Sequence, residues 1–558
     1  ASPSLSWLAS MALPLPQQIE DVVTFGGDWA REFAMHRQTL GTAALLLESR
    51  RGRAGHDRFP GLFAGDRGFG ENSGDVYGLT LGWSGSHRLC VERLREGPVV
   101  IQAGELFTHG DTLPATHESP WCHVAYSRRG LNGAMQALHA FLRDGVIPAK
   151  LKTKPRPVHY NTWEAIYFKH DMATLKDLAQ RAAQVGAERF VLDDGWFKGR
   201  NDDRTSLGDW TVDPAKYPEG LTPLITHVRG LGLEFGLWVE PEMVNPDSDL
   251  ARAHPDWVRR EDGKLILQRH QAVLDLARSD VRDHLFNALH ALLSDNEISY
   301  LKWDMNREVT GSGHHAQVKG VHDLIDRLRA AHPSVEIETC ASGGGRCDYG
   351  MLSRTDRVWV SDSNDALDRF DIQRNANLFL PPEMSGVHVG PASCHITGRK
   401  LSLELRAHVA IFGHMGTELD LRELDDASRA RLAQHIATYK AFRPLIHTGR
   451  WWRIETAGPD HKAIAVSSQD EREALCLLVR TGSSELGRGT SLRVPGLSAA
   501  LDYRVVAAGP QAPHVEQSLG HSLRSGNLRL SGAALLGRGL ELYLPRPESS
   551  LLLHVKTV

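Results

Sequence analysis

Carboxylates follow directly after several short apolar runs in the middle of this sequence, and a lysine accompanies one of them. In YLKWDMNR, residues 300–307, Lys302 and Asp304 lie two positions apart. On an extended strand this spacing directs both side chains to the same face. A neighbouring cation keeps a carboxylate ionised, as a nucleophile requires. A lone pair of this kind also fits a salt bridge at the end of a buried strand, so the other runs must decide between the two.

The same pattern recurs along some 200 residues. Polar side chains end the successive apolar runs at Glu164, Asp193, Asp194, Glu240, Asp304, Asn306, Cys340, Asp362 and Asp365, and four tryptophans, Trp163, Trp196, Trp238 and Trp303, lie among them. Carboxylates and amides hydrogen-bond sugar hydroxyls, and indole faces pack against the C–H patches of a sugar ring. A ring of such residues favours a sugar site over a purely structural core.

Two carboxylates facing each other across a sugar can cleave a glycosidic bond. In the retaining geometry they lie about 5–5.5 Å apart, and one attacks the anomeric carbon while the other protonates the leaving oxygen. Neighbouring strands of a sheet are separated by about 4.8 Å. Carboxylates that follow the fourth and sixth runs, Asp304 and Asp362, can therefore meet across one bound sugar.

The apolar runs alternate with amphipathic stretches from about residue 158 to residue 450. In DMATLKDLAQRAAQVG, residues 171–186, the apolar residues fall on one helical face and the final glycine predicts the helix end. Repeated strand–helix alternation predicts parallel strands, because parallel neighbours need long crossovers. We count eight strands, with AVLDLA, residues 272–277, as a ninth candidate. This predicts a (β/α)₈ barrel. An open doubly wound sheet is the alternative, but no glycine-rich phosphate loop follows the first run.

The segments on either side of the predicted barrel lack its alternation of strands and helices. Residues 1–150 are mostly β with a connecting helix, residues 151–448 form the barrel, and residues 449–558 contain short strands separated by turn signals. The sequence therefore predicts a multidomain α/β plus β protein, with an N-terminal β-sandwich, a central TIM barrel and a C-terminal antiparallel β-sandwich.

Composition excludes several classes of function. The chain has 558 residues, a net charge of −4 and 24% charged residues, which gives no reason to expect a nucleic acid or an anionic membrane as a partner. No apolar run approaches the roughly 20 residues that span a bilayer. The six cysteines form no C-x-x-C pair and the histidines form no H-E-x-x-H motif, so we expect no metal site. The first residues lack a signal-peptide pattern, which leaves the cytoplasm as the expected location.

Seven motifs carry a resemblance to a known family. DDGWF, SLGDWTVDPAKYPEGL, FGLWVEPEMVNPDSDL, HPDW, YLKWDMNR, CASGGGRCDYGML and SDSNDALDRFDIQ resemble the microbial α-galactosidases of glycoside hydrolase family 36, between about Tyr160 and Arg450. The resemblance implies a retaining, metal-independent enzyme without a cofactor that acts on α-galactoside oligosaccharides as a homodimer or homotetramer. It also implies an N-terminal β-supersandwich. A longer segment usually precedes the barrel in this family, so we expect an incomplete supersandwich here.

The resemblance also implies a role for each matching residue. Asp304 becomes the nucleophile and Asp362 the general acid/base, with Asp365 as a lesser candidate. The expected substrate-binding residues are Asp193 and Asp194 for the 4- and 6-hydroxyls of galactose, Trp238 on the pocket wall, Arg269 and Lys302 for ring hydroxyls, and Cys340 and Gly343 near the 2-position, with Asn306 nearby. His388 and His395 could touch the substrate or be structural, and Glu240 and Glu242 could be ligands or partners of ligands.

Several alternatives stay open at this point. The same scaffold could act as an α-N-acetylgalactosaminidase or transfer galactose to another sugar. Because Asp194, Glu240 and Asp304 end successive strands, a metal-dependent TIM-barrel lyase is a more distant alternative. A catalytically inactive sugar-binding protein is disfavoured by the intact carboxylate pair. Asp193 or Asp194 could instead cap a helix, and Cys340 could serve packing alone.

Overall fold

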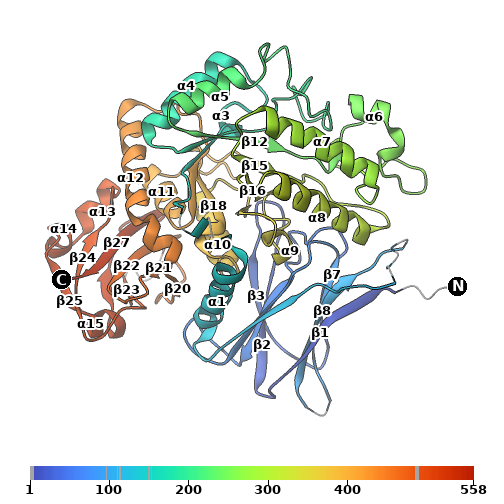
Figure 1. Ribbon diagram of the computed structural model, residues 1–558. Coiled ribbons are helices and arrows are strands. Elements are labelled where there is room, and N and C mark those ends of the chain that lie inside the picture. The colour runs from blue at the N-terminus through green and yellow to red at the C-terminus, as the bar shows by residue number, and fades with distance from the viewer. Residues whose placement is uncertain are drawn as a thin grey trace.

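The computed structural model describes residues 5–95, 97–109, 111, 113, 115–148, 151–152, 154–483 and 489–558. A β-sandwich at the N-terminal end lies against a central barrel, and a mostly antiparallel β region at the C-terminal end packs against another side of the same barrel (Figure 1). Helix α1 (Gly130–Phe141) contacts strands of both flanking parts. Among the described residues, no helix combines the length and the apolar character that a bilayer crossing requires.

The N-terminal sandwich consists of two antiparallel sheets. One has the order β1 (Trp7–Leu15), β8 (Val99–Leu106), β7 (His87–Arg93) and β4 (Leu45–Ser49); the other has the order β3 (Ala34–Thr39), β2 (Ile19–Gly26), β5 (Gly61–Asp66), β6 (Val76–Leu81) and β9 (Cys122–Ser127). Alternate residues of the strands point between the sheets, as the two-residue period dictates. Leu89 and Val91 of β7 and Ile101 and Ala103 of β8 are fully buried in this core.

Eight parallel strands close into a barrel, as the sequence predicts. They follow in the order β10 (His159–Asn161), β11 (Arg189–Leu192), β12 (Glu234–Val239), β15 (Tyr300–Trp303), β16 (Glu336–Thr339), β17 (Arg357–Trp359), β18 (Ser385–Val389) and β19 (His414–Thr417), and β19 pairs with β10. Closure removes the open-sheet alternative. The ninth candidate lies outside the barrel, because β14 (Ala272–Val273) pairs with β13 (Met243–Val244) in a separate antiparallel hairpin.

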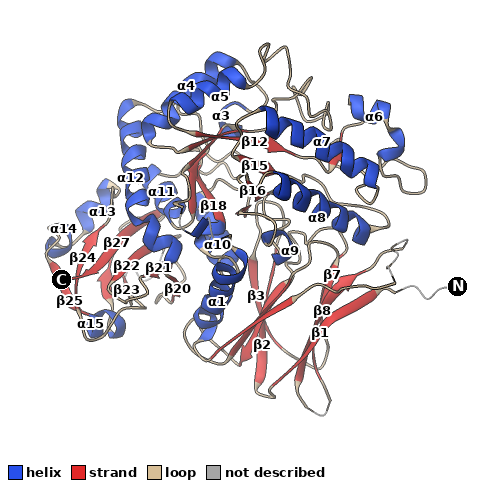
Figure 2. Cartoon of the chain, viewed as in Figure 1, coloured by secondary structure: helices blue, strands red, loops and turns tan. Residues whose placement is uncertain are grey.

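Helices surround the barrel and form the crossovers between its strands (Figure 2). They are α3 (Trp163–Ile166), α4 (Met172–Val185), α5 (Thr222–Gly230), α6 (Asp249–Ala253), α7 (Ser279–Asp295), α8 (His314–Ala331), α9 (Tyr349–Leu352), α10 (Ala366–Ala376) and α11 (Leu403–Ile411), with the 3₁₀ helices η2 (Pro255–Trp257) and η3 (Pro382–Met384). The π-helix η1 (Leu142–Val146) precedes the first barrel strand, and α12 (Asp426–Thr448) follows the last. Helix α4 shows how the sequence sets the bounds. Asp171 accepts a hydrogen bond from the Thr174 backbone N–H at 2.9 Å, and Gly186 ends the helix with φ of 96°.

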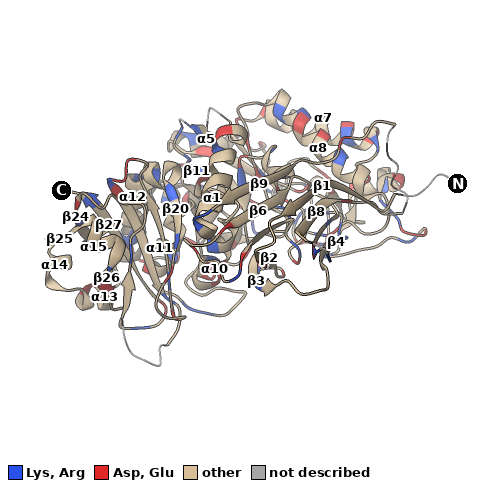
Figure 3. Cartoon of the chain, turned by 90° about the horizontal axis from the view of Figure 1, so that it is seen from below, with Lys and Arg blue, Asp and Glu red and all other residues tan. Residues whose placement is uncertain are grey.

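Charged side chains of both signs alternate along the outer helices. Figure 3 shows acidic and basic positions interspersed on α7 and α8. Arg282 of α7 lies 2.9 Å from Asp323 of α8, and Arg327 of α8 lies 2.9 Å from Asp283 of α7. These pairs hold neighbouring helices in register on the barrel surface, each with a small contribution because solvent screens them.

The C-terminal part is built on a six-stranded sheet. Its order is β20 (Arg450–Ile454), β21 (His461–Ser467), β22 (Glu473–Arg480), β27 (Ser549–Thr557), β24 (Asp502–Ala507) and β25 (Leu528–Ser531). One face packs on α11 and α12 of the barrel. A thinner layer covers the other face: the pair β23 (Thr490–Leu492) and β26 (Leu540–Leu542), with helices α13 (Pro513–Ser518), α14 (His521–Arg524) and α15 (Gly532–Gly537).

Candidate active site

A cavity of about 420 Å³ opens at the carboxyl ends of the barrel strands. In a parallel barrel the loops that follow the strands meet at this one end, so side chains distant in sequence converge there. The cavity is lined by Trp29, Trp163, Glu164, Tyr167, Phe168, Asp193, Asp194, Arg200, Asp203, Trp238, Arg269, Gln271, Lys302, Asp304, Asn306, Trp359, Asp362, Asn364, His395 and Glu418. Carboxylates and indole rings dominate this wall, which suits a sugar.

Asp304 is fixed by hydrogen bonds to both carboxylate oxygens. Its Oδ1 accepts from the Met305 backbone N–H at 2.8 Å. Its Oδ2 accepts from Asn306 Nδ2 at 2.7 Å and from Trp238 Nε1 at 3.1 Å. Asp304 is only 6% exposed and lies on the wall of the cavity. It is therefore held in one orientation and cannot rotate away from a bound substrate.

The surroundings of Asp304 keep it ionised. Burial alone would raise the pKa of this carboxyl, but the Lys302 ammonium, the Cys340 thiol and the Met305 and Asn306 donors outweigh burial and lower the pKa below its ordinary value. Beside it, burial and the Asp304 charge raise the pKa of Glu240 to about 8. The negative charge of this pair therefore resides on Asp304 at neutral pH.

Lys302 joins the fourth strand of the barrel to the second. Its Nζ donates to Asp193 Oδ2 at 2.8 Å, and Asn161 Nδ2 donates to the same oxygen at 2.7 Å. Burial disfavours the ammonium, but Asp193 and the other carboxylates around it raise the pKa of Lys302 well above its ordinary value. Lys302 and Asp193 thus present a fixed charge pair to the cavity.

Asp194 lies in a different pair. Arg200 Nε and Nη2 donate to its two oxygens at 3.0 and 2.7 Å in a forked arrangement. Burial raises the pKa of Asp194 although Arg200 opposes the rise. Neither Asp193 nor Asp194 caps a helix, so the structure disfavours the helix-cap interpretation of the DDGW segment.

Asp362 accepts hydrogen bonds from two indoles on opposite oxygens. Trp359 Nε1 lies 3.0 Å from Oδ1, and Trp29 Nε1 lies 2.8 Å from Oδ2. Trp359 belongs to β17 of the barrel, whereas Trp29 belongs to the N-terminal sandwich and is 45% exposed. The sandwich therefore forms part of the cavity wall at the second carboxylate.

A second residue of the sandwich lies behind Asp362. Glu32 is 2% exposed, accepts from the Gly344 backbone N–H at 3.2 Å and hydrogen-bonds the Ser361 hydroxyl. Gly343 makes room for it: with φ of +75°, an added Cβ would lie 2.6 Å from Glu32 Oε1 and 2.7 Å from the Asp362 nitrogen. Glu32 and Gly343 together fix the backbone that carries Asp362.

The environment of Glu32 leads to a pH-dependent stability prediction. Burial, with the Asp362 charge adding to it, raises the pKa of Glu32 from its ordinary 4.5 to about 7. Between these values the folded chain holds a proton that the unfolded chain has released, so stability falls as pH rises, by about 3 kcal/mol in total. Glu32→Gln cannot ionise and escapes this loss. Calorimetry gives the unfolding temperature of Glu32→Gln minus that of the wild type. This difference should be more positive at pH 8 than at pH 5. Equal differences at both pH values would contradict the assignment.

Most of the residues expected from the sequence meet in the cavity. Asp193, Asp194, Trp238, Arg269, Lys302, Asn306, Asp304 and Asp362 all line it. Cys340 and Gly343 differ, because neither is part of the lining. Cys340 is 2% exposed and hydrogen-bonds Asp304 from behind, and Gly343 packs against the Asp362 backbone.

Asp365 does not share the cavity. Its side chain accepts from the backbone N–H groups of Leu367 and Asp368 at the start of α10 and pairs with Arg399 at 2.8 Å. It is a helix cap, which leaves Asp362 as the carboxylate of this segment that faces the cavity. Of the two histidines, His395 lines the cavity, whereas His388 lies inside the barrel with its Nδ1 2.9 Å from Glu418 Oε2.

Two of the tryptophans expected at the sugar site are structural. Trp196 is fully buried and donates to the Trp238 carbonyl at 2.8 Å, and Trp303 is fully buried and donates to Glu242 at 2.8 Å. Glu242 in turn pairs with Arg346. Trp303, Glu242 and Arg346 thus form a buried chain of contacts outside the cavity lining.

Sequence reasoning missed several cavity residues. Glu418 follows the eighth strand and Trp359 ends the sixth, so the strand-end rule could have found both. Arg200 lies in a loop beyond the DDGW motif, and Trp29 belongs to the sandwich. Nothing in the local sequence of these last two indicates that they reach the cavity.

The donors around the carboxylates disfavour the metal-dependent lyase. That alternative needs Asp194, Glu240 and Asp304 to direct free oxygens toward one cation. Instead, Asp194 is paired with Arg200, Asp304 accepts from an indole and an amide, and Glu240 accepts from Gln271 Nε2 at 3.1 Å. These oxygens face N–H groups, which occupy the lone pairs that a cation would need.

Comparisons with known proteins agree with this geometry. Residues 2–113 match the profile described as glycosyl hydrolase family 36 N-terminal domain, and residues 116–449 match the profile described as melibiase. An α-galactosidase of Escherichia coli is 43% identical over 98% of this chain and 79% of that protein. α-Galactosidase AgaA of Geobacillus stearothermophilus is 35% identical over 90% of this chain and 71% of that protein.

Solved structures give the same answer. The AgaA crystal structure matches with a TM-score of 0.90 at 33% identity, covering 99% of this chain and 76% of AgaA. The galactosidase domain of the α-galactosidase–sucrose kinase AgaSK matches with a TM-score of 0.91 at 34% identity, covering 99% of this chain and 75% of that one. A double variant of AgaA, with a TM-score of 0.91, was solved in complex with raffinose. The chain thus belongs to glycoside hydrolase family 36.

Proposed function

We propose that this chain is a retaining exo-α-galactosidase that removes terminal galactose from raffinose- and melibiose-type oligosaccharides by double displacement. The observation that carries the proposal is the pair Asp304 and Asp362 on the wall of one sugar-sized cavity, with the charge of Asp304 maintained by Lys302. The family relatives named as α-galactosidases support the choice of sugar.

The floor and walls of the cavity suit a single hexose. Asp193 and Lys302 offer an acceptor and a donor side by side, 2.8 Å apart, and Asp194 and Arg200 offer a second such pair. Neighbouring hydroxyls of a sugar can each accept from one group and donate to the other. We assign the Asp193 and Asp194 pairs to the 4- and 6-hydroxyls of galactose, with Trp238 against the ring.

Cleavage proceeds in two steps. Asp304 Oδ attacks the anomeric carbon from the β face, and Asp362 gives its proton to the departing glycosidic oxygen as the C–O bond breaks. This leaves a β-galactosyl ester on Asp304 and an ionised Asp362. Asp362 then takes a proton from water, whose oxygen attacks the same carbon, and α-galactose and free Asp304 result.

The test compares p-nitrophenyl α-galactoside with its N-acetylgalactosaminide analogue and follows the first product by ¹H NMR. We expect kcat/KM to favour the galactoside by about 100-fold or more, because a site shaped for a hydroxyl must repack to admit an acetamido group. The first anomer released should be α-galactose. Faster turnover of the N-acetyl substrate would assign the chain to the α-N-acetylgalactosaminidases. p-Nitrophenyl digalactosides without free galactose would assign it to the transferases, because the substrate then serves as the galactosyl acceptor.

We also propose the domain bounds, the oligomeric state and the cellular location of the enzyme. The functional units are residues 1–150, 151–448 and 449–558. The active form is a homodimer or homotetramer, which sedimentation velocity would resolve, and the enzyme acts in the cytoplasm. The family resemblance supports the oligomer, and the run of strands after Arg450 supports the last boundary.

A further inference from the structure

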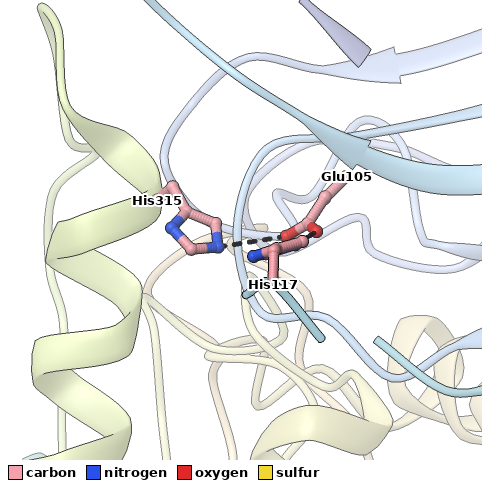
Figure 4. Close-up of side chains that lie close together, drawn as sticks. All are labelled: Glu105, His117 and His315. Atoms are coloured by element: carbon pink, nitrogen blue, oxygen red, sulfur yellow. Dashed lines mark hydrogen bonds and ion pairs between the residues drawn. The ribbon is translucent and has the colours of Figure 1, made fainter. Parts of the chain in front are cut away.

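Two histidines and a glutamate meet where the N-terminal sandwich contacts the barrel. Glu105 lies near the end of β8, His117 lies in the segment between β8 and β9, and His315 lies in the first turn of α8 (Figure 4). One ligand atom from each lies within 4.8 Å of the other two. None of the three lines the active-site cavity. Within the part of the chain that the structure describes, no other group of three such side chains is this close.

The cluster contains buried polar atoms without hydrogen-bond partners. The Glu105 side chain is fully buried and the His315 side chain is 7% exposed. Glu105 Oε2 and His315 Nε2 lie 3.2 Å apart, within ion-pair distance of each other, but neither atom has a hydrogen-bond partner. Burying such groups without partners is unfavourable. A carboxylate oxygen and an imidazole nitrogen this close together are typical of ligands that share an ion.

The spacing fits a small tetrahedral ion. With metal–ligand bonds of 2.0–2.2 Å at tetrahedral angles, two ligands of Zn²⁺ lie about 3.3–3.6 Å apart. The Glu105–His315 separation of 3.2 Å is close to the lower end of this range. His117 Nε2 contacts the other oxygen of Glu105, so its ring needs only a small movement to place the nitrogen on the same centre. Figure 4 shows both rings directed at the carboxylate.

The surroundings hold the two imidazoles in place. Trp83 stacks on His315 with ring centroids 5.1 Å apart and an interplanar angle of 24°. Phe107 lies 5.4 Å from the His315 ring and 6.0 Å from the His117 ring. The Asp111 carboxylate accepts from the His315 backbone N–H at 3.0 Å and fixes the start of α8. A rigid, largely apolar shell of this kind favours tight coordination.

We propose that Glu105, His117 and His315 bind one divalent transition-metal ion, of which Zn²⁺ is the best fit, and that this ion ties the N-terminal sandwich to the barrel. Two imidazoles and a carboxylate suit Zn²⁺, whereas Ca²⁺ and Mg²⁺ prefer oxygen ligands alone. Water completes the tetrahedron. The role is structural, because the ion is bound by side chains that the proposed hydrolysis does not use.

The test uses the full chain after chelation and dialysis. Calorimetric titration with ZnCl₂ at pH 7.5 should give one site per chain, Co²⁺ should give the visible absorption of a tetrahedral complex, and Zn²⁺ should raise the unfolding temperature. His117→Ala should weaken Zn²⁺ binding by about 100-fold or more and abolish the Co²⁺ spectrum. Glu105→Gln keeps the side-chain shape and should have a similar effect, so a folding defect in one variant does not decide the result.

The matched control is His36→Ala, which removes an exposed histidine of β3 and should leave binding unchanged. Absence of a saturable site in the wild-type chain would overturn the proposal. So would equal binding by wild type, His117→Ala and Glu105→Gln, since surface histidines would then account for the ion. In either case the contacts of Glu105 with His117 and His315 are contacts between side chains alone. Hydrolysis of the nitrophenyl galactoside, measured in parallel, tests the proposed function separately.

Discussion

Asp304→Ala should reduce the hydrolysis of p-nitrophenyl α-galactoside by roughly 10⁴-fold or more, because removal of a covalent nucleophile eliminates the first step. The variant also leaves space below the anomeric carbon. Sodium azide can enter this space and attack from the β face while Asp362 still protonates the leaving group. The expected product is β-galactosyl azide, which NMR of the reaction mixture would identify.

The control for this result is Asp365→Asn. Asp365 belongs to the same segment as Asp362 but caps α10 and pairs with Arg399, outside the cavity. The Asp365→Asn variant should have a lower unfolding temperature than the wild type, while its turnover stays within about tenfold of the wild-type value. In the presence of azide it should form no galactosyl azide. A folded Asp304→Ala that retains activity, or that yields no β-azide at high azide concentration, would remove Asp304 from the nucleophilic role.

Much of the barrel and its active end could be predicted from the sequence because both follow from short-range rules. The barrel strands are runs of three to six residues, and most of them are followed by polar side chains. Parallel connectivity gathers those ends at one place whatever the details of packing. For this reason Asp193, Trp238, Lys302, Asp304 and Asp362 could be predicted together from their positions alone. AVLDLA was ambiguous because a two-residue bridge and a barrel strand have the same local pattern.

Contacts between distant parts of the chain could not be predicted in this way. Trp29 meets Asp362 across 333 positions, and Glu32 meets Gly344 across 312. His315 contacts Glu105 although 210 positions separate them in the sequence, so no motif with a fixed spacing could predict the cluster. Such contacts depend on how the sandwich docks on the barrel, which strand and helix periodicity do not determine. The prediction that no metal is bound rested on the absence of short ligand motifs, and the proposed zinc site would lie outside that reasoning.

The roles of Cys340 and Gly343 show the same limit at shorter range. Both follow the fifth strand, and the family resemblance implied that they lie near the 2-position of the sugar. The left-handed φ of Gly343 and the burial of Cys340 instead turn them toward the two carboxylates. Cys340 and Gly343 support the orientation of Asp304 and Asp362 from behind. A substitution of either residue would therefore change selectivity at the 2-position by moving these carboxylates.

Asp362→Ala should show a loss that depends on the leaving group. Raffinose needs a proton on its departing oxygen, so its kcat/KM should fall by about 10³–10⁴-fold, within the range that a general acid supplies. p-Nitrophenol is a far better leaving group, so formation of the galactosyl ester on Asp304 should slow much less. Without Asp362 to activate water, that ester should accumulate and give a burst of nitrophenol in stopped-flow measurements.

Azide distinguishes the two carboxylates by stereochemistry. In Asp362→Ala it needs no general base and attacks the ester from the α face, so the product should be α-galactosyl azide, the opposite anomer to that from Asp304→Ala. Trp29→Phe serves as the companion variant, because it removes the indole N–H that reaches Asp362 Oδ2 at 2.8 Å but leaves the carboxylate. It should keep the retained α-galactose product and give no azide adduct. A β-azide from Asp362→Ala, or equal losses on raffinose and the nitrophenyl substrate, would mean that Asp362 does not act as the acid and base, and the double displacement would need another second carboxylate.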